Sequence, residues 1–406
     1  MTASVESSPH ILVACHAWYG DVLGGSFRLA SEFAEHLAAS GYRVTYACCA
    51  KSSDWDGPLD EIINGVRVVR YKPVKSVGGR FWRLRYHLRE TGKLAQRINR
   101  EARVTHLSGH SPLQALGAAK ALRRTVDYCN YTVHSPFDDE LTSNFGDHPK
   151  LPQRIGSWMA GRVDNKNCKI ADRVQCDSQY TLSVMTRKHG KPVKLKGIVA
   201  PGWVDASQFS PAANRLELRK TLGPDWQTES PIFFTLRRLE NRMGLETLIR
   251  ASEALTKQGL QFRTLIGGGG SLMKPLQSMI DEAGLSDSIK LLGRLPEEQL
   301  AACYAAADCF VLPTKALECF GLIVLEAFAC NTPVIASNVA AIPELAERQG
   351  IDWMFAPGDW SQLAGRMESM LRGKLRPTKD LRALALEYDK PKVLTAWQDL
   401  MRLERS

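Results

Sequence analysis

The chain has 406 residues, with 53 Lys or Arg against 43 Asp or Glu, so its formal net charge is +10. Hydrophobic residues make up 44% and charged residues 24%, which excludes disordered, collagen-like and coiled-coil classes. At about 100–200 residues per domain, this length predicts two or three domains.

The first half of the chain alternates apolar strands with amphipathic helices. Strands are expected at 10–17, 42–50, 104–110 and 126–135, and helices at 28–41 and through Lys120. A second series begins near residue 230, with strands expected at 231–239, 262–270, 288–295, 308–314 and 333–338. The two series meet near 198–205, so we expect an α/β fold of two doubly wound, Rossmann-like domains. Ligands of such sheets bind beyond the carboxyl ends of the strands, here in a cleft between the domains.

The sequence contains no apolar run of about 18 residues, so we expect no transmembrane helix. Its first ten residues lack the pattern of a signal peptide. The ten cysteines are scattered, without CxxC or metal-site spacing, and some lie in apolar runs, as Cys15, Cys309 and Cys330 do. We therefore expect reduced core thiols in a cytoplasmic protein, with peripheral attachment to the inner face of the plasma membrane as an option.

The positive charge is concentrated in one window. Residues 67–100 contain 11 basic residues and one acid, Glu90, a surplus equal to that of the whole chain. On a helical wheel, the apolar residues of 80–100 face one side. The other side carries a basic, aromatic surface: Trp82, Arg85, Tyr86, Arg89, Lys93 and Arg97. This pattern is consistent with a surface that binds an anionic membrane or a lipid-linked acceptor. A helix whose basic face is simply solvated explains it equally well. The window is short and no recognition module is present, so nucleic acid is not expected.

Two glutamates, Glu318 and Glu326, are separated by seven residues. The run 320–329 reads as a helix whose first turn, Phe320, Gly321 and Leu322, would offer free N–H groups and a positive dipole end to a diphosphate. Glu326 lies one turn beyond Leu322, where a carboxylate suits a ribose diol, and Glu318 can reach sugar hydroxyls. Two surface glutamates around a core helix are the alternative.

Three arginines, Arg237, Arg238 and Arg242, follow the strand expected at 231–239. A guanidinium binds two oxygens at once, which suits a departing diphosphate, although solvated loop arginines would give the same pattern. Gly24 and Gly25 permit close backbone approach at a helix start, or form a plain turn. They do not make a GxGxxG dinucleotide fingerprint.

Two further features lie at strand ends. His134 ends the strand expected at 126–135, where an arbitrary histidine is more often structural. The run of four glycines that includes Gly268 makes a tight turn that can approach a nucleotide. It lacks the Lys-Ser/Thr of a P-loop, so ATPase activity is not supported.

The segment 313–337 resembles the family-4 type of retaining glycosyltransferases with the GT-B fold, whose motif reads approximately P-S-x-x-E-G-F-G-L-x-x-L-E-A-M-A-x-G-x-P-V-V-A. The resemblance implies that Glu326 holds the nucleotide ribose and that Glu318 contacts the donor sugar. It also implies that the amides of 320–322 contact sugar and diphosphate. Cys319 departs from a usual Gly and adds bulk beside the donor sugar.

The family's G-R-L-x-x-x-K-G motif is similar to residues 237–244. Arg238 matches its Arg and Gly244 its Gly, whereas Met243 stands in the place of its Lys. The resemblance implies that these cations neutralise the leaving nucleoside diphosphate, with Arg242 as the expected substitute for the Lys and Arg237 as a spare.

The same resemblance implies the remaining donor contacts. Gly24 and Gly25 match a glycine loop that faces the donor diphosphate and the acceptor. His134 matches the histidine of a TxHG motif near the donor sugar, which favours a site role over the structural one. The backbone at Arg294 and Leu295 matches the loop that contacts the base.

The implied reaction is transfer of a sugar, with retained anomeric configuration, from a UDP- or GDP-type nucleotide-sugar to a hydroxyl of a glycan or lipid-linked acceptor in cell-envelope synthesis. No second carboxylate is placed for a double displacement, so we expect attack on the face of the departing group. No DxD occurs at a strand end, so neither a metal nor another cofactor is expected.

The acceptor is expected in 1–198 and the nucleotide-sugar in 199–385, while a helix in 386–406 crosses back to the first domain. The alternatives are a nucleotide-sugar epimerase or phosphorylase on the same fold and a non-catalytic sugar-nucleotide-binding subunit. The best support for the last is Met243, Cys319 and the pair Ala340–Ala341, which replaces a usual Gly pair.

Overall fold

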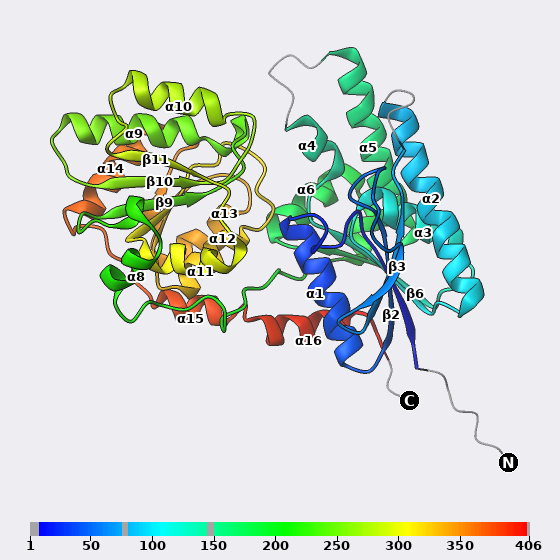
Figure 1. Cartoon of the computed structure of the whole chain (residues 1–406). Helices are drawn as coiled ribbons and strands as arrows, with labels where there is room; N and C mark the ends of the chain where they lie inside the picture. Colours follow the sequence, from blue (N-terminus) through cyan, green and yellow to red (C-terminus); the bar gives the residue numbers. More distant parts are fainter. Residues whose placement is uncertain (1–7, 75–79, 144–149, 404–406) are drawn as a thin grey trace. The chain divides into compact units, whose positions relative to one another are not determined.

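The computed structural model describes residues 8–74, 80–143 and 150–403, which fall into two compact units (Figure 1). Unit 1 is Met1–Gly202 with Val393–Ser406, and unit 2 is Trp203–Lys392. Each unit contains one sheet of mainly parallel strands with helices on both faces. The two doubly wound α/β units that the sequence predicts are confirmed.

The sheet of unit 1 has the strand order β3-β4-β2-β1-β5-β6-β7-β8, and all pairs are parallel except β3 with β4. Its strands are β1 (His10–Ala14), β2 (Arg43–Cys49), β3 (Asp60–Ile63), β4 (Val66–Tyr71), β5 (His106–Gly109), β6 (Tyr128–Val133), β7 (Arg173–Cys176) and β8 (Gly197–Val199). The sequence analysis missed β3, β4, β7 and β8. β3 and β4 each carry two charged residues within a short run, and β7 and β8 are only four and three residues long.

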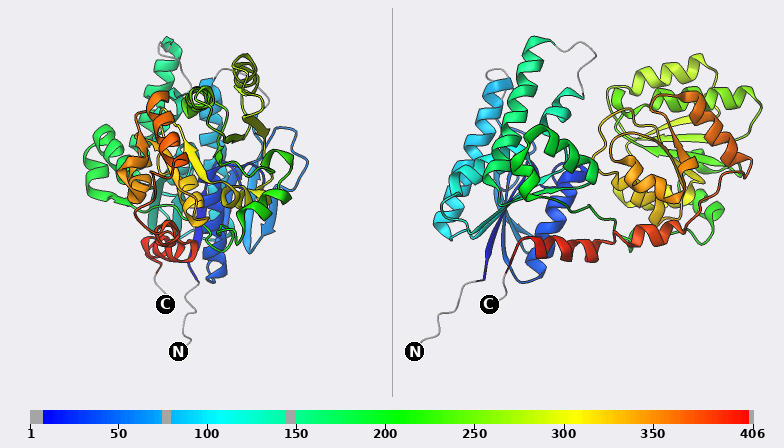
Figure 2. Two further views of the ribbon diagram at one scale, coloured as in Figure 1. Left: turned by 90° about the vertical axis from the view of Figure 1, so that its left-hand side faces the viewer. Right: turned by 180° about the vertical axis from the view of Figure 1, so that it is seen from behind.

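The helices of unit 1 are α1 (Gly25–Ala39), α2 (Arg80–Glu101), α3 (Pro112–Leu122), α4 (Phe137–Thr142), α5 (Leu151–Ile170), α6 (Gln179–His189) and α7 (Lys191–Lys196). On one face of the sheet, a single hydrophobic cluster contains Leu94 and Ile98 of α2 together with Ala118 and Leu122 of α3. The other face is covered by α1 and by the C-terminal helix α16 (Lys390–Leu400), drawn in red beside the blue α1 in Figures 1 and 2.

The C-terminal helix is fixed to unit 1 by its tryptophan. Trp397 is buried, its indole Nε1 donates to the carbonyl of Pro201 at 2.9 Å, and its ring meets that of Phe33 edge-on at 5.5 Å. Ser40, at the end of α1, donates to the Gln398 side chain at 3.1 Å. An aromatic side chain with its polar atom satisfied makes a strong anchor.

The sheet of unit 2 has the order β11-β10-β9-β12-β13-β14, with every pair parallel. Its strands are β9 (Ile232–Leu236), β10 (Arg263–Gly267), β11 (Ile289–Gly293), β12 (Cys309–Leu312), β13 (Val334–Ser337) and β14 (Met354–Phe355). Its helices are α8 (Arg215–Thr221), α9 (Leu245–Lys257), α10 (Met273–Glu282), α11 (Glu297–Ala306), α12 (Leu322–Ala329), α13 (Ile342–Ala346), α14 (Trp360–Leu371) and α15 (Leu381–Leu386).

Alternation along β9 sorts the two cores of unit 2. Phe233 belongs to the cluster under α9, α10 and α14, whereas Ile232 and Phe234 belong to the cluster under α11 and α12. Successive side chains of a strand point to opposite faces, so one strand supplies both layers. Helix α9 has the matching pattern, since Leu245, Leu248 and Ile249 are fully buried on one side.

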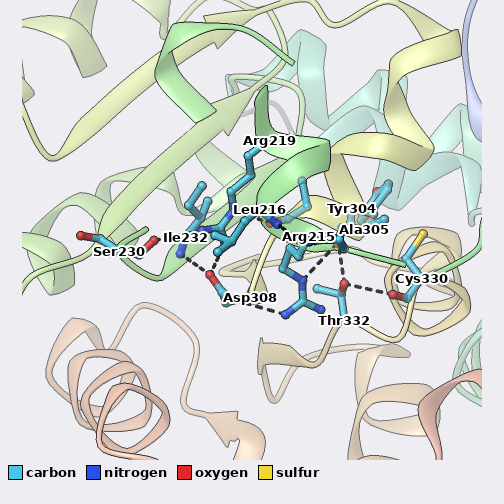
Figure 3. A network of polar contacts seen from close by, with 12 residues as sticks. Arg215, Leu216, Arg219, Ser230, Ile232, Tyr304, Ala305, Asp308, Cys330 and Thr332 are labelled. Atoms are coloured by element: carbon cyan, nitrogen blue, oxygen red, sulfur yellow. Dashed lines mark hydrogen bonds and ion pairs between the residues drawn. The ribbon is translucent and has the colours of Figure 1, made fainter. Parts of the chain in front are cut away.

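A polar network ties α8 to the sheet of unit 2 (Figure 3). The buried Arg219 donates to the carbonyl of Ala306 at 3.0 Å and to those of Thr228 and Ser230, and it pairs with Asp308. Asp308 also accepts from the backbone N–H of Ile232 at 2.7 Å. A buried guanidinium is tolerated when its donors are satisfied in this way.

All ten cysteines are buried with free thiols, as expected from the sequence. In the part of the chain that the structure describes, no helix combines the length and apolarity that crossing a membrane requires.

Candidate active site

The candidate site lies at the topological switch point of the unit 2 sheet. β9 is flanked by β10 and β12, so the chain leaves β9 and β12 in opposite directions across the sheet. Ligands of open α/β sheets bind beyond the carboxyl ends of the strands at such a point. The loop after β9 carries the three arginines and the loop after β12 carries Glu318.

Arg237 is the most deeply buried of the three arginines, with 9% of its surface exposed. Its Nη2 lies 2.8 Å from the Glu318 carboxylate, 3.1 Å from the Thr314 hydroxyl and 2.9 Å from the Met243 sulfur. The guanidinium therefore lies beside Met243, where the family motif has a lysine. The sequence analysis treated Arg237 as a spare, whereas the structure places it in the middle of the cluster.

Arg242 is the second arginine of the cluster that contacts the Glu318 loop. Its Nη1 donates to the carbonyl of Leu317 at 2.8 Å, and burial together with repulsion from Arg237 lowers the pKa of its guanidinium. The Nε atoms of Arg237 and Arg242 are buried, and neither has a hydrogen-bond partner in the described part of the chain. Arg238 is exposed. A buried donor without a partner calls for an explanation, and an anion held by these guanidiniums would supply one.

Two glycines let the loops of the cluster approach each other closely. Gly268 has φ +124°, and a Cβ there would lie 1.8 Å from the carbonyl oxygen of Arg237. Gly244 has φ +69°, and a Cβ there would lie 1.9 Å from the carbonyl oxygen of Pro313. Neither position accepts a side chain, which explains why a glycine ends the motif at 237–244 and why a glycine follows strand β10.

The helix after Glu318 begins two residues later than the sequence predicts. α12 starts at Leu322 and not at Phe320, because Gly321 adopts the left-handed conformation with φ +96°. Phe320 is buried and packs against the Tyr388 ring, with centroids 6.0 Å apart. The predicted first turn is thus a glycine turn followed by a helix start, with Leu322 half-buried.

The departures from the family motif fit the backbone to different degrees. Asn331, which stands where the family usually has a glycine, has φ +55°, a conformation that asparagine tolerates. Cys319 is buried at 8% exposure. Ala340 also has φ +55°, which costs an alanine roughly 1–2 kcal/mol relative to its usual conformation. The Ala341 N–H donates to the carbonyl of Glu318 at 3.0 Å, so this turn supports the Glu318 loop.

Glu326 is buried at 4% exposure and accepts a hydrogen bond of 2.9 Å from the Tyr304 hydroxyl. Burial and the neighbouring carboxylate raise the pKa of Tyr304 well above its usual value, so the phenol stays protonated and donates. The Tyr304 carbonyl accepts from Thr332 at 2.7 Å, within the network of Figure 3. The arrangement fixes the orientation of the Glu326 side chain.

The base-contact loop predicted from the resemblance follows β11. Arg294 is exposed, Leu295 is half-buried, and a Cβ on Gly267 would meet the Leu295 side chain at 2.8 Å. The structure places this loop beside the glycine run, because the Gly268 N–H donates to the carbonyl of Gly293 at 2.7 Å. The role of the loop stays a prediction.

In unit 1, α1 begins at Gly25, directly after Gly24, so the two glycines lie at a helix start. His134 has partners on both ring nitrogens: Nδ1 lies 3.0 Å from Asp177 and Nε2 lies 3.1 Å from the His110 ring. Only 10% of its side chain is exposed. This geometry favours the structural role that the sequence analysis weighed first, and the site role of His134 stays a prediction.

The basic helix is present as predicted. α2 spans Arg80–Glu101, and the charged residues of the basic surface, Arg85, Arg89, Lys93 and Arg97, are exposed together with Trp82, while Tyr86 is half-buried. On the opposite side Ala95 and Ile98 are buried and Leu84 and Leu88 are half-buried, while the side chain of Phe81 lies outside the described residues.

Part of the positive charge of residues 67–100 is neutralised in the folded chain by carboxylates from other segments. Arg70 is buried and pairs with Asp21 at 2.6 Å and Glu61 at 2.5 Å. Arg67 pairs with Asp60 and Glu101, both at 2.6 Å. All four carboxylates come from outside the window, so the strand part of it is neutralised and the surplus belongs to α2.

Sequence reasoning missed Thr314 and Tyr304, which hold Arg237 and Glu326 in place. Both are buried side chains that act through hydrogen bonds to residues distant in the sequence, and neither has a local pattern that marks it. It also missed Lys315, which follows Thr314, pairs with Glu246 and donates its backbone N–H to the Arg242 carbonyl at 2.8 Å.

Comparison with known proteins gives two domain families. Residues 23–208 match the model "Glycosyltransferase Family 4" and residues 221–385 match "Glycosyl transferases group 1". A GDP-mannose-dependent alpha-(1-6)-phosphatidylinositol monomannoside mannosyltransferase of Mycolicibacterium smegmatis is 32% identical over 183 residues, 43% of this chain and 46% of the relative. A D-inositol 3-phosphate glycosyltransferase of Mycobacterium sp. (strain KMS) is 31% identical over 250 residues, 60% of this chain and 52% of the relative.

The matches thus span about half the length of these relatives. Among solved structures, sucrose-phosphate synthase of Thermosynechococcus elongatus is 22% identical with a TM-score of 0.81, covering 97% of this chain and 98% of that one. Anabaena HepE in complex with UDP and glucose is 18% identical with a TM-score of 0.73, covering 97% and 99%. The chain belongs to the family-4-type glycosyltransferases with the GT-B fold.

Proposed function

We propose that the chain is a retaining, metal-independent glycosyltransferase that moves a sugar from a nucleoside-diphosphate sugar to an acceptor hydroxyl in cell-envelope glycolipid or polysaccharide synthesis. The observation that carries the proposal is the pair of guanidiniums beside Glu318, from the buried Arg237 and the half-buried Arg242, whose buried Nε donors lack partners among the described residues. The names of the mannosyl- and inositol-phosphate transferases that it resembles support the acceptor class.

The diphosphate of the donor is assigned to the arginine cluster. The buried Arg237 and the half-buried Arg242 supply positive charge, and the exposed Arg238 supplies a third guanidinium near the surface. Charge developing on a leaving diphosphate is stabilised best by cations fixed in advance. Glu326, held by Tyr304, is assigned to the ribose of a UDP- or GDP-type donor.

The transfer step needs little covalent chemistry from the protein. The bond between the sugar's anomeric carbon and the diphosphate oxygen breaks, and a bond from that carbon to the acceptor oxygen forms on the same face. The acceptor proton passes to the leaving diphosphate. Glu318, neutralised by Arg237 at 2.8 Å, orients the donor sugar and does not act as the nucleophile.

The test begins with a thermal-shift screen of UDP- and GDP-sugars, since a ligand at 100 times its Kd adds about 2.7 kcal/mol of stability. Donor hydrolysis is then measured for the wild type, Arg238→Ala and Glu318→Gln. We expect each variant to lose about 10²–10³-fold in kcat, as after removal of one preorganised group. Arg372→Ala, at an exposed arginine directly after α14, is the matched control.

Each alternative function predicts a different outcome. Unchanged hydrolysis in both variants would contradict the assignment of these residues. Binding without turnover in the wild type would favour a non-catalytic subunit, and a product that keeps its nucleotide would indicate an epimerase.

We also propose that the exposed charges of α2 dock unit 1 on an anionic membrane. A second feature supports this: the first turns of α5 expose Leu151, Ile155 and Trp158, at 69%, 50% and 62%, with Arg162 4.8 Å from the Trp158 ring centroid. Exposed apolar residues on a helix together with basic side chains fit the interface of an anionic bilayer.

Liposome sedimentation tests the docking. A variant with Arg85, Arg89, Lys93 and Arg97 changed to Ser should bind vesicles of phosphatidylglycerol about 10²-fold or more weakly, at about 1 kcal/mol per basic residue. The control removes the same charge from exposed positions of unit 2: Lys220, Lys257, Arg372 and Lys374. Equal losses in both variants would contradict docking through α2.

A further inference from the structure

Two turns of unit 2 with an unfavourable backbone conformation meet at Glu318. In the part of the chain that the structure describes, the residues other than glycine with a positive φ are Asn64, Leu317, Asn331, Ala340 and Arg402. Asparagine tolerates this left-handed conformation, and Arg402 lies in the turn that follows the last helix. Of the remaining two, Leu317 directly precedes Glu318, and Ala340 precedes the residue whose N–H binds the Glu318 carbonyl.

The side chain of Leu317 does not explain its conformation. With φ +56°, the Cβ of a leucine crowds the following carbonyl oxygen. Leu317 is only half-buried, and the two residues before it, Lys315 and Ala316, are exposed. Strain of this kind persists only where the surrounding structure over-determines the backbone, and it clusters at functional sites. The contacts that fix this turn must therefore come from elsewhere in the fold.

Three hydrogen bonds fix the backbone around Glu318. Arg242 Nη1 donates to the Leu317 carbonyl at 2.8 Å, and the Lys315 N–H donates to the Arg242 carbonyl at 2.8 Å. From the second turn, the Ala341 N–H donates to the Glu318 carbonyl at 3.0 Å. The backbone is thus held both before Glu318 and at Glu318 itself, by groups that are distant in the sequence.

Resting on the function proposed above, we propose that Leu317 and Ala340 are positioning residues, whose left-handed backbone conformations hold Glu318 for the donor sugar. The Glu318 carboxylate lies 2.8 Å from Arg237 Nη2, and 20% of its side chain is exposed, so it is accessible to a ligand. A group that is fixed before binding needs no reorganisation during the reaction. Arg242 joins the turn to the arginine cluster, because the guanidinium that holds the Leu317 carbonyl also has a buried Nε without a partner among the described residues.

Two substitutions at Leu317 separate its backbone conformation from its side-chain contacts. Both Leu317→Asn and Leu317→Val remove the leucine side chain, but asparagine adopts the left-handed conformation, whereas the β-branched valine resists it. We expect Leu317→Asn to keep the kcat of donor hydrolysis within about threefold of the wild type. Leu317→Val should lower kcat about 10–10²-fold, as after a displacement of about 1 Å, while the Kd of UDP or GDP changes less than about threefold.

The split between kcat and Kd distinguishes positioning from a merely structural role, which would lower Tm and leave the kcat of the folded protein unchanged. Ala316→Val is the control, because Ala316 is an exposed neighbour in the same loop and has no positive φ. It should keep the kcat of the wild type. Equal losses of kcat in the two Leu317 variants would assign the effect to the side chain and overturn the proposal, as would a Leu317→Val variant with unchanged kcat.

Thermal unfolding tests the strain without any donor. Ala340→Gly should raise Tm by about 2–4 °C, because glycine adopts a positive φ at no steric cost. Ala316→Gly, at an ordinary φ, should lower Tm, because glycine gives the unfolded chain more freedom. A lower Tm in both variants would overturn the role of Ala340. A wild type that neither binds nor hydrolyses a nucleotide-sugar would contradict the proposed function, whereas the Tm comparison would still decide whether the turn is strained.

Discussion

The arginine cluster of unit 2 and the basic face of α2 in unit 1 use positive charge in opposite ways. In the cluster, Arg237 and Arg242 are largely withdrawn from water and lie within reach of Glu318 and Glu240, although residues 201–406 carry a net charge of only −1. On α2, four cations are exposed along one helix face, in a half of the chain with net charge +11.

The contrast shows that a charge count along the sequence can reveal a charged surface but not a buried ionic site. Exposed charges act collectively and are screened by salt, so a surplus in the sequence marks a surface. Buried charges act individually, because each must be paired or leave a strong site for an anion. The diphosphate site that we propose therefore lies in the half without surplus charge.

The largest expected effect comes from breaking a buried ion pair of unit 2. Arg219→Ala would leave the carboxylate of Asp308 without its buried cation and several carbonyls without a donor, at a cost of about 3–5 kcal/mol in the free energy of unfolding. Arg103→Ala, which removes the exposed pair with Asp127 in unit 1, should cost less than about 1 kcal/mol. Denaturant unfolding measures both, and equal losses would contradict the contrast between buried and exposed charge.

A smaller effect tests whether packing against α3 fixes the basic face of α2. A Cβ on Gly117 of α3 would lie 2.5 Å from the carbonyl oxygen of Leu88, so Gly117→Ala should destabilise the protein by about 1–3 kcal/mol. Gly156→Ala in α5, where a Cβ meets nothing within 4 Å, should stabilise it by up to about 1 kcal/mol through helix propensity. Stabilisation by both changes would show that α2 and α3 are not in close contact.

A third effect is a pH dependence in unit 1. The pKa of His87 is about 4 in the folded chain against about 6.5 in the unfolded chain, so between these values the unfolded state binds more protons. Stability from this group is therefore present above pH 6.5 and is lost as pH falls toward 4. Burial raises the pKa of Asp164 to about 7, which acts in the opposite sense.

A comparison of unfolding free energies between wild type and His87→Gln isolates the histidine. The difference between the two proteins should change between pH 6.5 and pH 4, with the wild type losing more stability. A difference that is constant over this range would contradict a depressed pKa at His87.

The sequence predicts the parts of this fold and site that depend on local patterns. α2 has the predicted bounds to within one residue because its apolar and basic residues follow the helical period. Glu326 lies on α12 as expected because the strand–loop–helix pattern is local. These elements need no information from distant residues.

What the sequence does not predict depends on partners that are far apart along the chain. Arg237 looks like a spare until Glu318, 81 residues later, lies 2.8 Å from it. Gly92 lies inside the run that predicts α2, where a glycine lowers helix propensity. In the structure it permits close approach to Gly117, whose carbonyl oxygen would lie 3.2 Å from an added Cβ. The surplus at 67–100 includes Arg70, which Asp21 neutralises from 49 residues away.

The most direct test of the central claim, that the arginine cluster of unit 2 binds a nucleoside diphosphate, is isothermal titration of the full-length chain with UDP and GDP. The account predicts that one of them binds to the wild type, that Arg242→Ala raises its Kd at least about tenfold, and that Arg97→Ala on α2 leaves it unchanged. An equal change in both variants at unchanged Tm, or no binding of either nucleotide, would contradict the claim.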